Sequence, residues 1–190
     1  MKSRKRSTPE SVKARREARG TLTEAGPVVE AAAAFLAVRP RSIGETRRRL
    51  GHLGYPQVLI DEVLERFAEV GYLDDEAFAR TWVESRDRAR PRGEIALRRE
   101  LAQKGVGREV VDEVLADRLD ESEEGDPNLA AATALLQRKR ASLEREPDER
   151  KRRQKAYALL ARNGFDTETC RAVSASLATD VGETDDDADR

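Results

Sequence analysis

The fold is decided by one short stretch, Leu101-Ala102-Gln103-Lys104-Gly105-Val106, because its pattern occurs three times in the chain. In each copy a leucine is followed by three residues, a glycine and a bulky apolar residue. The other two copies are Leu50…Gly54-Tyr55 and Leu160…Gly164-Phe165. Glycine accepts the left-handed backbone conformation that ends helices, so each copy predicts the end of a helix.

Further apolar residues follow each of these glycines at fixed offsets. Six residues beyond the glycine stand Ile60, Val111 and Cys170, and nine residues beyond it stand Val63, Val114 and Val173. Self-similarity at a period of about 50–60 residues is typical of a chain built from stacked copies of one small unit. Such chains usually present surfaces to partners and seldom enclose a catalytic pocket.

Ala, Leu, Glu and Arg dominate between these copies, and runs of alternating polar and apolar residues are few, which predicts helices. The sequence therefore predicts an all-α fold, an elongated array of three tandem three-helix repeats. The expected helices cover about 28–38, 43–53, 56–70, 74–89, 94–104, 108–119, 129–145, 149–163 and 166–178. The expected parts are a disordered basic tail (1–27), repeats at 28–73, 74–119 and 128–178, an acidic linker (120–127) and a disordered acidic tail (179–190).

The composition excludes several classes of protein. Of 190 residues, 38% are charged and 4% are aromatic, and no apolar run approaches the roughly 20 residues that span a bilayer. The basic N-terminus lacks the apolar segment of a secretory signal. A single cysteine cannot form an internal disulfide and is typical of a reducing compartment. We therefore expect a cytoplasmic protein.

The net charge of −1 hides a strong segregation of charge. Residues 1–27 carry eight Lys/Arg and three Glu, whereas residues 179–190 carry six Asp/Glu and one Arg. Residues 113–126 carry seven acids and one Arg, which leaves a net charge of +5 on the rest of the chain. A basic body with an acidic linker and an acidic tail indicates a surface for anionic partners.

No set of residues suited to catalysis is present. His52 is the only histidine, so sites that need two histidines are excluded. Cys170 takes the repeat position of Ile60 and Val111, which favours a core residue over a nucleophile. The acids Asp74-Asp75-Glu76 are explained by their favourable charge at a helix start, with a metal site as the minor alternative. We expect no enzyme activity, no metal and no cofactor.

Basic residues are the main candidates for binding. They gather before the repeated glycines, at Arg47–Arg49, around the bend Arg90-Pro91-Arg92-Gly93 and at Arg150–Lys155. A basic stripe of this kind suits an acidic protein surface or a phosphate backbone. Trp82 shares an apolar stripe with Phe78. We therefore predict that it packs in the core or between repeats, with a role as an anchor for a partner as the lesser alternative. The candidate partner-binding residues are Arg86, Arg88, Arg90, Arg92, Arg98, Arg99, Arg152 and Arg153.

Two stretches resemble the RecX family of regulatory proteins. They are Gly71-Tyr72-Leu73-Asp74-Asp75-Glu76-Ala77-Phe78-Ala79-Arg80-Thr81-Trp82-Val83-Glu84-Ser85-Arg86 and Leu97-Arg98-Arg99-Glu100-Leu101-Ala102-Gln103-Lys104-Gly105-Val106. The similarity extends over about 28–177. It departs from the family at the bend, where members often have a glycine and an aromatic residue.

The resemblance implies a non-enzymatic regulator that lies in the groove of the RecA recombinase filament on DNA. Such a protein would block filament extension and reduce ATPase, strand-exchange and co-protease activity. We expect it to act as a monomer, and to bind the filament less well when Arg98 and Arg99 are reversed to Glu. A helical protein that binds DNA directly through its arginine clusters is the alternative.

Overall fold

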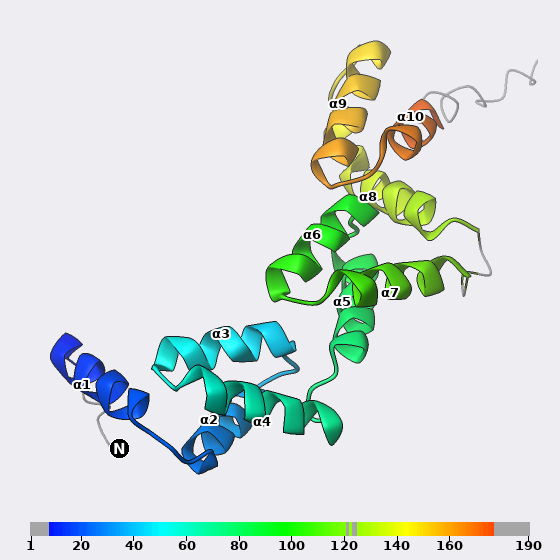
Figure 1. The fold of residues 1–190 in the computed structure, drawn as a ribbon. Coiled ribbons are helices and arrows are strands. Elements are labelled where there is room, and N and C mark those ends of the chain that lie inside the picture. The colour runs from blue at the N-terminus through cyan, green and yellow to red at the C-terminus, as the bar shows by residue number, and fades with distance from the viewer. Residues whose placement is uncertain (1–7, 121, 123–124, 177–190) are drawn as a thin grey trace, which may run out of the picture. The chain divides into compact units, whose positions relative to one another are not determined.

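The computed structural model describes residues 8–120, 122 and 125–176, which form ten helices and no strand (Figure 1). None of these helices has the length and apolar content to cross a membrane. The helices are α1 (Pro9–Gly20), α2 (Gly26–Leu36), α3 (Ile43–Leu53), α4 (Gln57–Glu69), α5 (Asp75–Ala89), α6 (Glu94–Lys104), α7 (Arg108–Asp120), α8 (Pro127–Leu143), α9 (Glu149–Arg162) and α10 (Thr167–Ser176).

The chain divides into two compact units. The first takes in the chain up to Phe78 together with Lys104–Gly107, and the second takes in Ala79–Gln103 and the chain from Arg108 onward. The division therefore falls within the second repeat, and each unit is described by itself below.

The first repeat is built from α2, α3 and α4, which pack on one another. Their apolar faces meet in a core that excludes water from Val28, Leu50, Ile60 and Val63 among others. The third repeat has the same plan, with α8, α9 and α10 in mutual contact. Its core includes Cys170, which is 1% exposed. The all-α fold of tandem three-helix repeats predicted from the sequence is confirmed.

The repeated glycines end the second helix of each repeat. Gly54, Gly105 and Gly164 have φ angles of 95°, 84° and 82°, in the left-handed region that favours glycine. In the first repeat the backbone N–H of Tyr55 donates to the Leu50 carbonyl at 3.3 Å, and Phe165 donates likewise to Leu160 at 3.3 Å. This is the bond that closes a Schellman cap, and it brings the apolar residue after the glycine onto the leucine.

The expectation that residues 1–27 lack structure is wrong for Pro9–Gly20, which form α1. Thr8 caps this helix, because its side-chain oxygen accepts from the Ser11 N–H at 3.3 Å, and Pro9 occupies a first-turn position that tolerates proline. Alanine, glutamate and arginine then give α1 a high helix propensity. The segment lacks a buried residue, which is why its sequence resembles a disordered tail.

The other predicted helices are all helices in the structure. The start of α8 at Pro127 is two residues earlier than expected. Asp126 caps it by accepting from the Asn128 N–H at 2.7 Å. The predicted acidic tail and the first seven residues lie outside the described part of the chain.

Candidate partner-binding surface

The bend between α5 and α6 carries most of the candidate arginines. The Arg90 N–H donates to the Arg86 carbonyl at 2.8 Å and closes the last turn of α5. Pro91 and Gly93 are buried, and the Gly93 carbonyl accepts from the Leu97 N–H at 3.0 Å to open α6. A proline and a glycine therefore turn the chain sharply where the sequence predicts a break.

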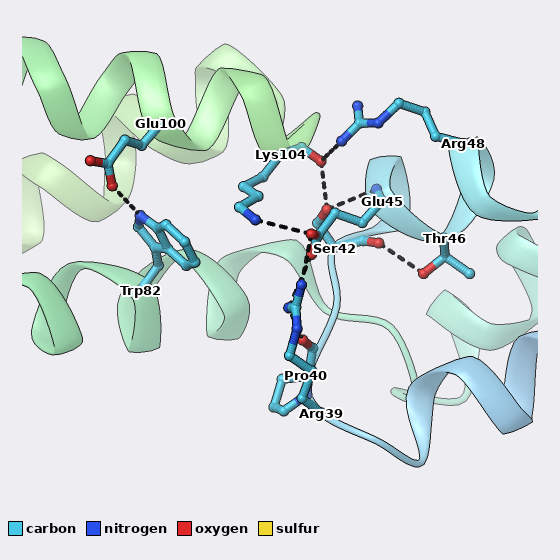
Figure 2. A network of polar contacts seen from close by, with 9 residues as sticks. All are labelled: Arg39, Pro40, Ser42, Glu45, Thr46, Arg48, Trp82, Glu100 and Lys104. Carbon is cyan, nitrogen blue, oxygen red and sulfur yellow. Dashed lines mark hydrogen bonds and ion pairs between the residues drawn. The ribbon is translucent and has the colours of Figure 1, made fainter.

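Glu100 on α6 contacts three side chains from α5 and the bend. Its Oε2 atom accepts from Trp82 Nε1 at 2.9 Å, as Figure 2 shows, and from Arg86 Nε at 2.6 Å. Its Oε1 atom lies 3.4 Å from Arg92 Nε. The Arg86 guanidinium also lies over the Trp82 ring, 4.2 Å from its centroid. These contacts hold Arg86 and Arg92 within the protein and fix the position of the bend.

Arg98 is also engaged within the second unit. It donates to Glu94 at 2.8 Å and forms an ion pair with Asp112 on α7. Burial lowers the pKa of Arg98, but the bonds to the two carboxylates outweigh that effect and raise it. The Arg98 side chain therefore connects α6 to α7 and is less available to an external anion.

Two further ion pairs tie α5 to α7. Arg80 pairs with Asp117, and Arg118 donates to Asp87 through Nη2 at 2.8 Å and Nε at 3.0 Å. Burial raises the pKa of the Asp87 carboxyl, and the facing guanidinium only partly offsets this. Ion pairs thus join all three helices of the second repeat.

The remaining candidates of the second repeat are exposed. Arg88 is 80% exposed and lies 4.0 Å from Glu84, a distance at which a surface pair contributes little. Arg90 and Arg99 are exposed as well. These three side chains are available to an external anion.

The third cluster lies at the start of α9. Arg152 is half-buried, and Arg153 is exposed and lies 3.8 Å from Glu149. Lys155 pairs with Glu146. Only part of this basic run is therefore neutralised within the protein.

A cationic group in the first repeat joins Arg49, from a predicted basic cluster, to Arg41, which lies outside the clusters predicted from the sequence. The Arg41 and Arg49 guanidinium groups lie 4.2 Å and 5.9 Å from the centroid of the Phe35 ring. Burial, together with repulsion by Arg39 and Arg49, lowers the pKa of Arg41. A signal was present, because Arg39-Pro40-Arg41 repeats the sequence Arg90-Pro91-Arg92.

The acids considered as metal ligands serve as helix caps. Asp74 Oδ1 accepts from the Ala77 N–H at 2.9 Å, and Asp75 Oδ1 accepts from the Ile43 N–H at 2.9 Å at the start of α3. Burial raises the pKa of Asp75, although the bond from Ile43 acts against it. Within the described ranges, no group of three or more His, Cys, Asp or Glu residues is placed to hold a metal ion.

The neighbourhood of Cys170 does not provide a nucleophile. Its thiol donates to the Phe165 carbonyl at 3.6 Å, and burial raises its pKa, which disfavours the reactive thiolate. His52 is exposed near the end of α3, in the other unit. Cys170 is thus a core residue, as its repeat position predicts.

Three tandem three-helix repeats with ion-paired arginines define a class of helical repeat protein, and comparisons place the chain within that class. Models of the first, second and third three-helix domains of RecX match residues 29–67, 74–115 and 126–173. The chain belongs to the RecX family.

Curated relatives and solved structures agree. The chain is 35% identical over 149 residues to the Regulatory protein RecX of Prosthecochloris aestuarii, a match that covers 76% of this chain and 89% of that relative. It is 37% identical over 147 residues to the Regulatory protein RecX of Mycolicibacterium smegmatis, with 77% of each covered. The crystal structure of RecX from Lactobacillus salivarius superposes with a TM-score of 0.69 at 16% identity, over 82% of this chain and 97% of that one.

Proposed function

We propose that this chain is a negative regulator of the RecA recombinase that binds in the groove of the RecA–DNA filament. It blocks filament extension there and so reduces ATPase, strand-exchange and co-protease activity. The observation that carries the proposal is membership of the RecX family, whose curated members are named regulatory proteins. In this role the chain is a cytoplasmic, non-enzymatic monomer.

The exposed arginines supply the contact with the filament. Arg88, Arg90 and Arg99 project from the second repeat, and Arg153 projects from the third beside the half-buried Arg152. They meet carboxylates of the filament or phosphates of its DNA, both of which pair well with guanidinium groups. Arg86, Arg92 and Arg98 act indirectly, because their ion pairs hold the helices that carry the exposed side chains.

Regulation works by mass action. A protein that binds one state of the filament shifts the filament population by its difference in affinity between states. A protein that blocks the growing end needs far fewer copies than there are filament subunits. Inhibition at a small ratio of this protein to RecA therefore supports action at the end.

The test is DNA-dependent ATP hydrolysis by the RecA of the same organism, with this protein titrated in. Hydrolysis and filament length are expected to fall, and Arg99→Glu is expected to weaken the effect by about tenfold, the loss of one charge-assisted contact. Arg66→Glu is the matched control, since Arg66 is an exposed arginine of α4 outside the proposed surface. Unchanged hydrolysis at equimolar wild-type protein would refute the function.

Direct binding to DNA is the second candidate, and the Arg41–Phe35–Arg49 group favours it. Two cations that repel each other beside one ring are stabilised by an anion such as a phosphate. This candidate predicts equal affinity for naked and RecA-coated DNA, falling steeply with salt. Co-sedimentation with each substrate over a range of salt concentrations separates the two functions.

A further inference from the structure

The cap glycines do more than end helices, because each lies against a segment that precedes its own repeat. We use the word joint for this contact between a cap glycine and the preceding segment. The joint at Gly105 lies within the first unit and the joint at Gly164 lies within the second. A third contact of the same kind occurs at Gly54, where the preceding segment is α1.

At Gly105 the preceding segment is the start of α3. A Cβ atom on Gly44 would lie 2.7 Å from the Gly105 Cα atom, so the two backbones touch. The Lys104 carbonyl accepts from Ser42 Oγ at 2.6 Å and from Arg48 Nη2 at 2.9 Å (Figure 2). Lys104 Nζ also donates to Glu45 at 3.0 Å, which adds an ion pair to the joint.

At Gly164 the preceding segment is the bend before α6. A Cβ atom on Gly93 would lie 2.2 Å from the Gly164 carbonyl oxygen. The Asn163 carbonyl accepts from the Gly93 N–H at 3.1 Å, and Arg92 donates to the Asn163 side-chain oxygen. Ser42 and Gly93 make equivalent contacts, since both stand twelve residues before the cap glycine of their own repeat.

At Gly54 the preceding segment is α1, and it makes contacts of the same kind. A Cβ atom on Gly54 would lie 2.8 Å from the Arg16 carbonyl oxygen. Arg19 Nη1 donates to the Leu53 carbonyl at 3.2 Å, and the Arg19 guanidinium lies 5.2 Å from the centroid of the Tyr55 ring. In all three places an arginine reaches the residue just before the cap glycine.

One physical cause explains the three contacts. The last carbonyls of a helix have no partner within the helix, and the helix dipole makes that end negative. At Gly54 and Gly105 the guanidinium groups of Arg19 and Arg48 satisfy both needs by donating to the last carbonyl. At Gly164 the Gly93 N–H donates to the Asn163 carbonyl, and Arg92 brings its positive charge to the Asn163 side chain. The glycine lets the neighbouring backbone come close enough for the bond to form.

We propose that the end of the second helix in each repeat is a docking site for an arginine-bearing segment, and that α1 fills this site in the first repeat in place of a preceding repeat. α1 is then a separable cap. It buries no side chain of its own, so polar contacts with Leu53 and backbone packing on Gly54 hold it in place. Leu22, which follows α1, is half-buried against the core of the first repeat and so tethers α1 to that repeat.

The third repeat differs from the first two at the position that forms their joints. Twelve residues before Gly164, where Ser42 and Gly93 stand in the earlier repeats, the third repeat has Arg152. A long side chain therefore replaces the small residue found at the two joints.

Hydrogen exchange of α1 amides in the full-length protein tests the proposal. Arg19→Ala is expected to speed exchange over α1 by about tenfold, because the docked state loses its charged hydrogen bond while the helix keeps a good helix former. Lys13→Ala removes an exposed side chain of the same helix that pairs with Glu17, and it is expected to change exchange by less than about twofold.

A second pair of variants makes the test independent of Arg19. Gly54→Ala and Gly71→Ala both place a side chain at positive φ, 95° and 73°, but a Cβ on Gly71 meets nothing within 4 Å. Only Gly54→Ala is expected to release α1. Unchanged α1 exchange in both Arg19→Ala and Gly54→Ala would overturn the proposal, and so would an equal rise over α2–α4 in Arg19→Ala, which would make α1 part of the repeat core.

Discussion

Arginine serves two purposes in the second repeat, and the difference lies in its neighbours. Arg98 and Arg99 are adjacent in sequence, yet Arg98 pairs with two carboxylates and Arg99 is exposed. Both residues are partner-binding candidates by sequence. The Glu94 pair of Arg98 follows helical spacing, but Asp112 lies fourteen positions away on another helix, a separation that the sequence pattern does not relate.

Reversal of these two charges is expected to have different effects on stability. Arg98→Glu places a third carboxylate beside Glu94 and Asp112, and we expect a loss of about 1–2 kcal/mol, modest because the pair is partly exposed. Arg99→Glu is expected to change stability by less than about 0.5 kcal/mol. Urea unfolding followed by circular dichroism measures both.

The double reversal is therefore expected to lower stability as well as partner binding. Arg99→Glu alone is the cleaner probe of partner binding. Equal stability of the two single variants would show that the Arg98 pairs contribute nothing measurable.

At the scale of helices, local signals in the sequence are sufficient for most boundaries. Gly54 and Gly164 end α3 and α9, and Asp166 begins α10, each as its sequence pattern predicts. α1 was missed because the prediction relied on bulky apolar residues, and this helix docks through arginines instead. Contacts between helices, including the joints, depend on the packing of whole repeats and leave no periodic signal.

Acid titration is expected to reveal the cap of α10. Asp166 accepts from the Thr169 N–H at 2.8 Å and from its hydroxyl at 2.6 Å, and these bonds lower the pKa of the carboxyl. A lowered folded-state pKa adds stability above the unfolded value of about 3.9, and that stability is lost as pH falls through the folded value. Asn keeps the cap but does not titrate.

The wild-type protein should therefore be more stable than Asp166→Asn at pH 7, and the difference should shrink as pH falls below about 4. Urea midpoints at several pH values supply the comparison. A difference that stays constant down to pH 3 would mean that the charge of Asp166 plays no part in the cap.

At the scale of the whole molecule, the repeats share one plan, and the second adds ion pairs to it. All three repeats bury apolar side chains, among them Leu97, Leu101 and Val114 in the second. The helices of the second repeat are also joined by Arg80–Asp117, Arg86–Glu100 and Arg98–Asp112. The fold class and the repeat number could be predicted from the sequence. The sequence could not predict which arginines face outward, because that depends on the carboxylates of neighbouring helices.

The joint in the second unit is expected to contribute to global stability. A Cβ on Gly164 would lie 2.4 Å from the Ala96 Cβ and backbone nitrogen, and the residue would also be strained at φ 82°. Gly71→Ala carries the strain alone, about 1–2 kcal/mol, so Gly164→Ala should cost more than this. Thermal unfolding of both variants gives the comparison, and equal melting temperatures would argue that the joint relaxes freely.

The long side chain of Arg152 bears on how such a protein changes in evolution. A repeat added after the third by gene duplication would place its cap glycine against Arg152, where the joints have Ser42 and Gly93. Such a repeat would dock poorly until a small residue replaced Arg152. A new copy inserted between existing repeats, where Ser42 or Gly93 is already in place, meets no such barrier.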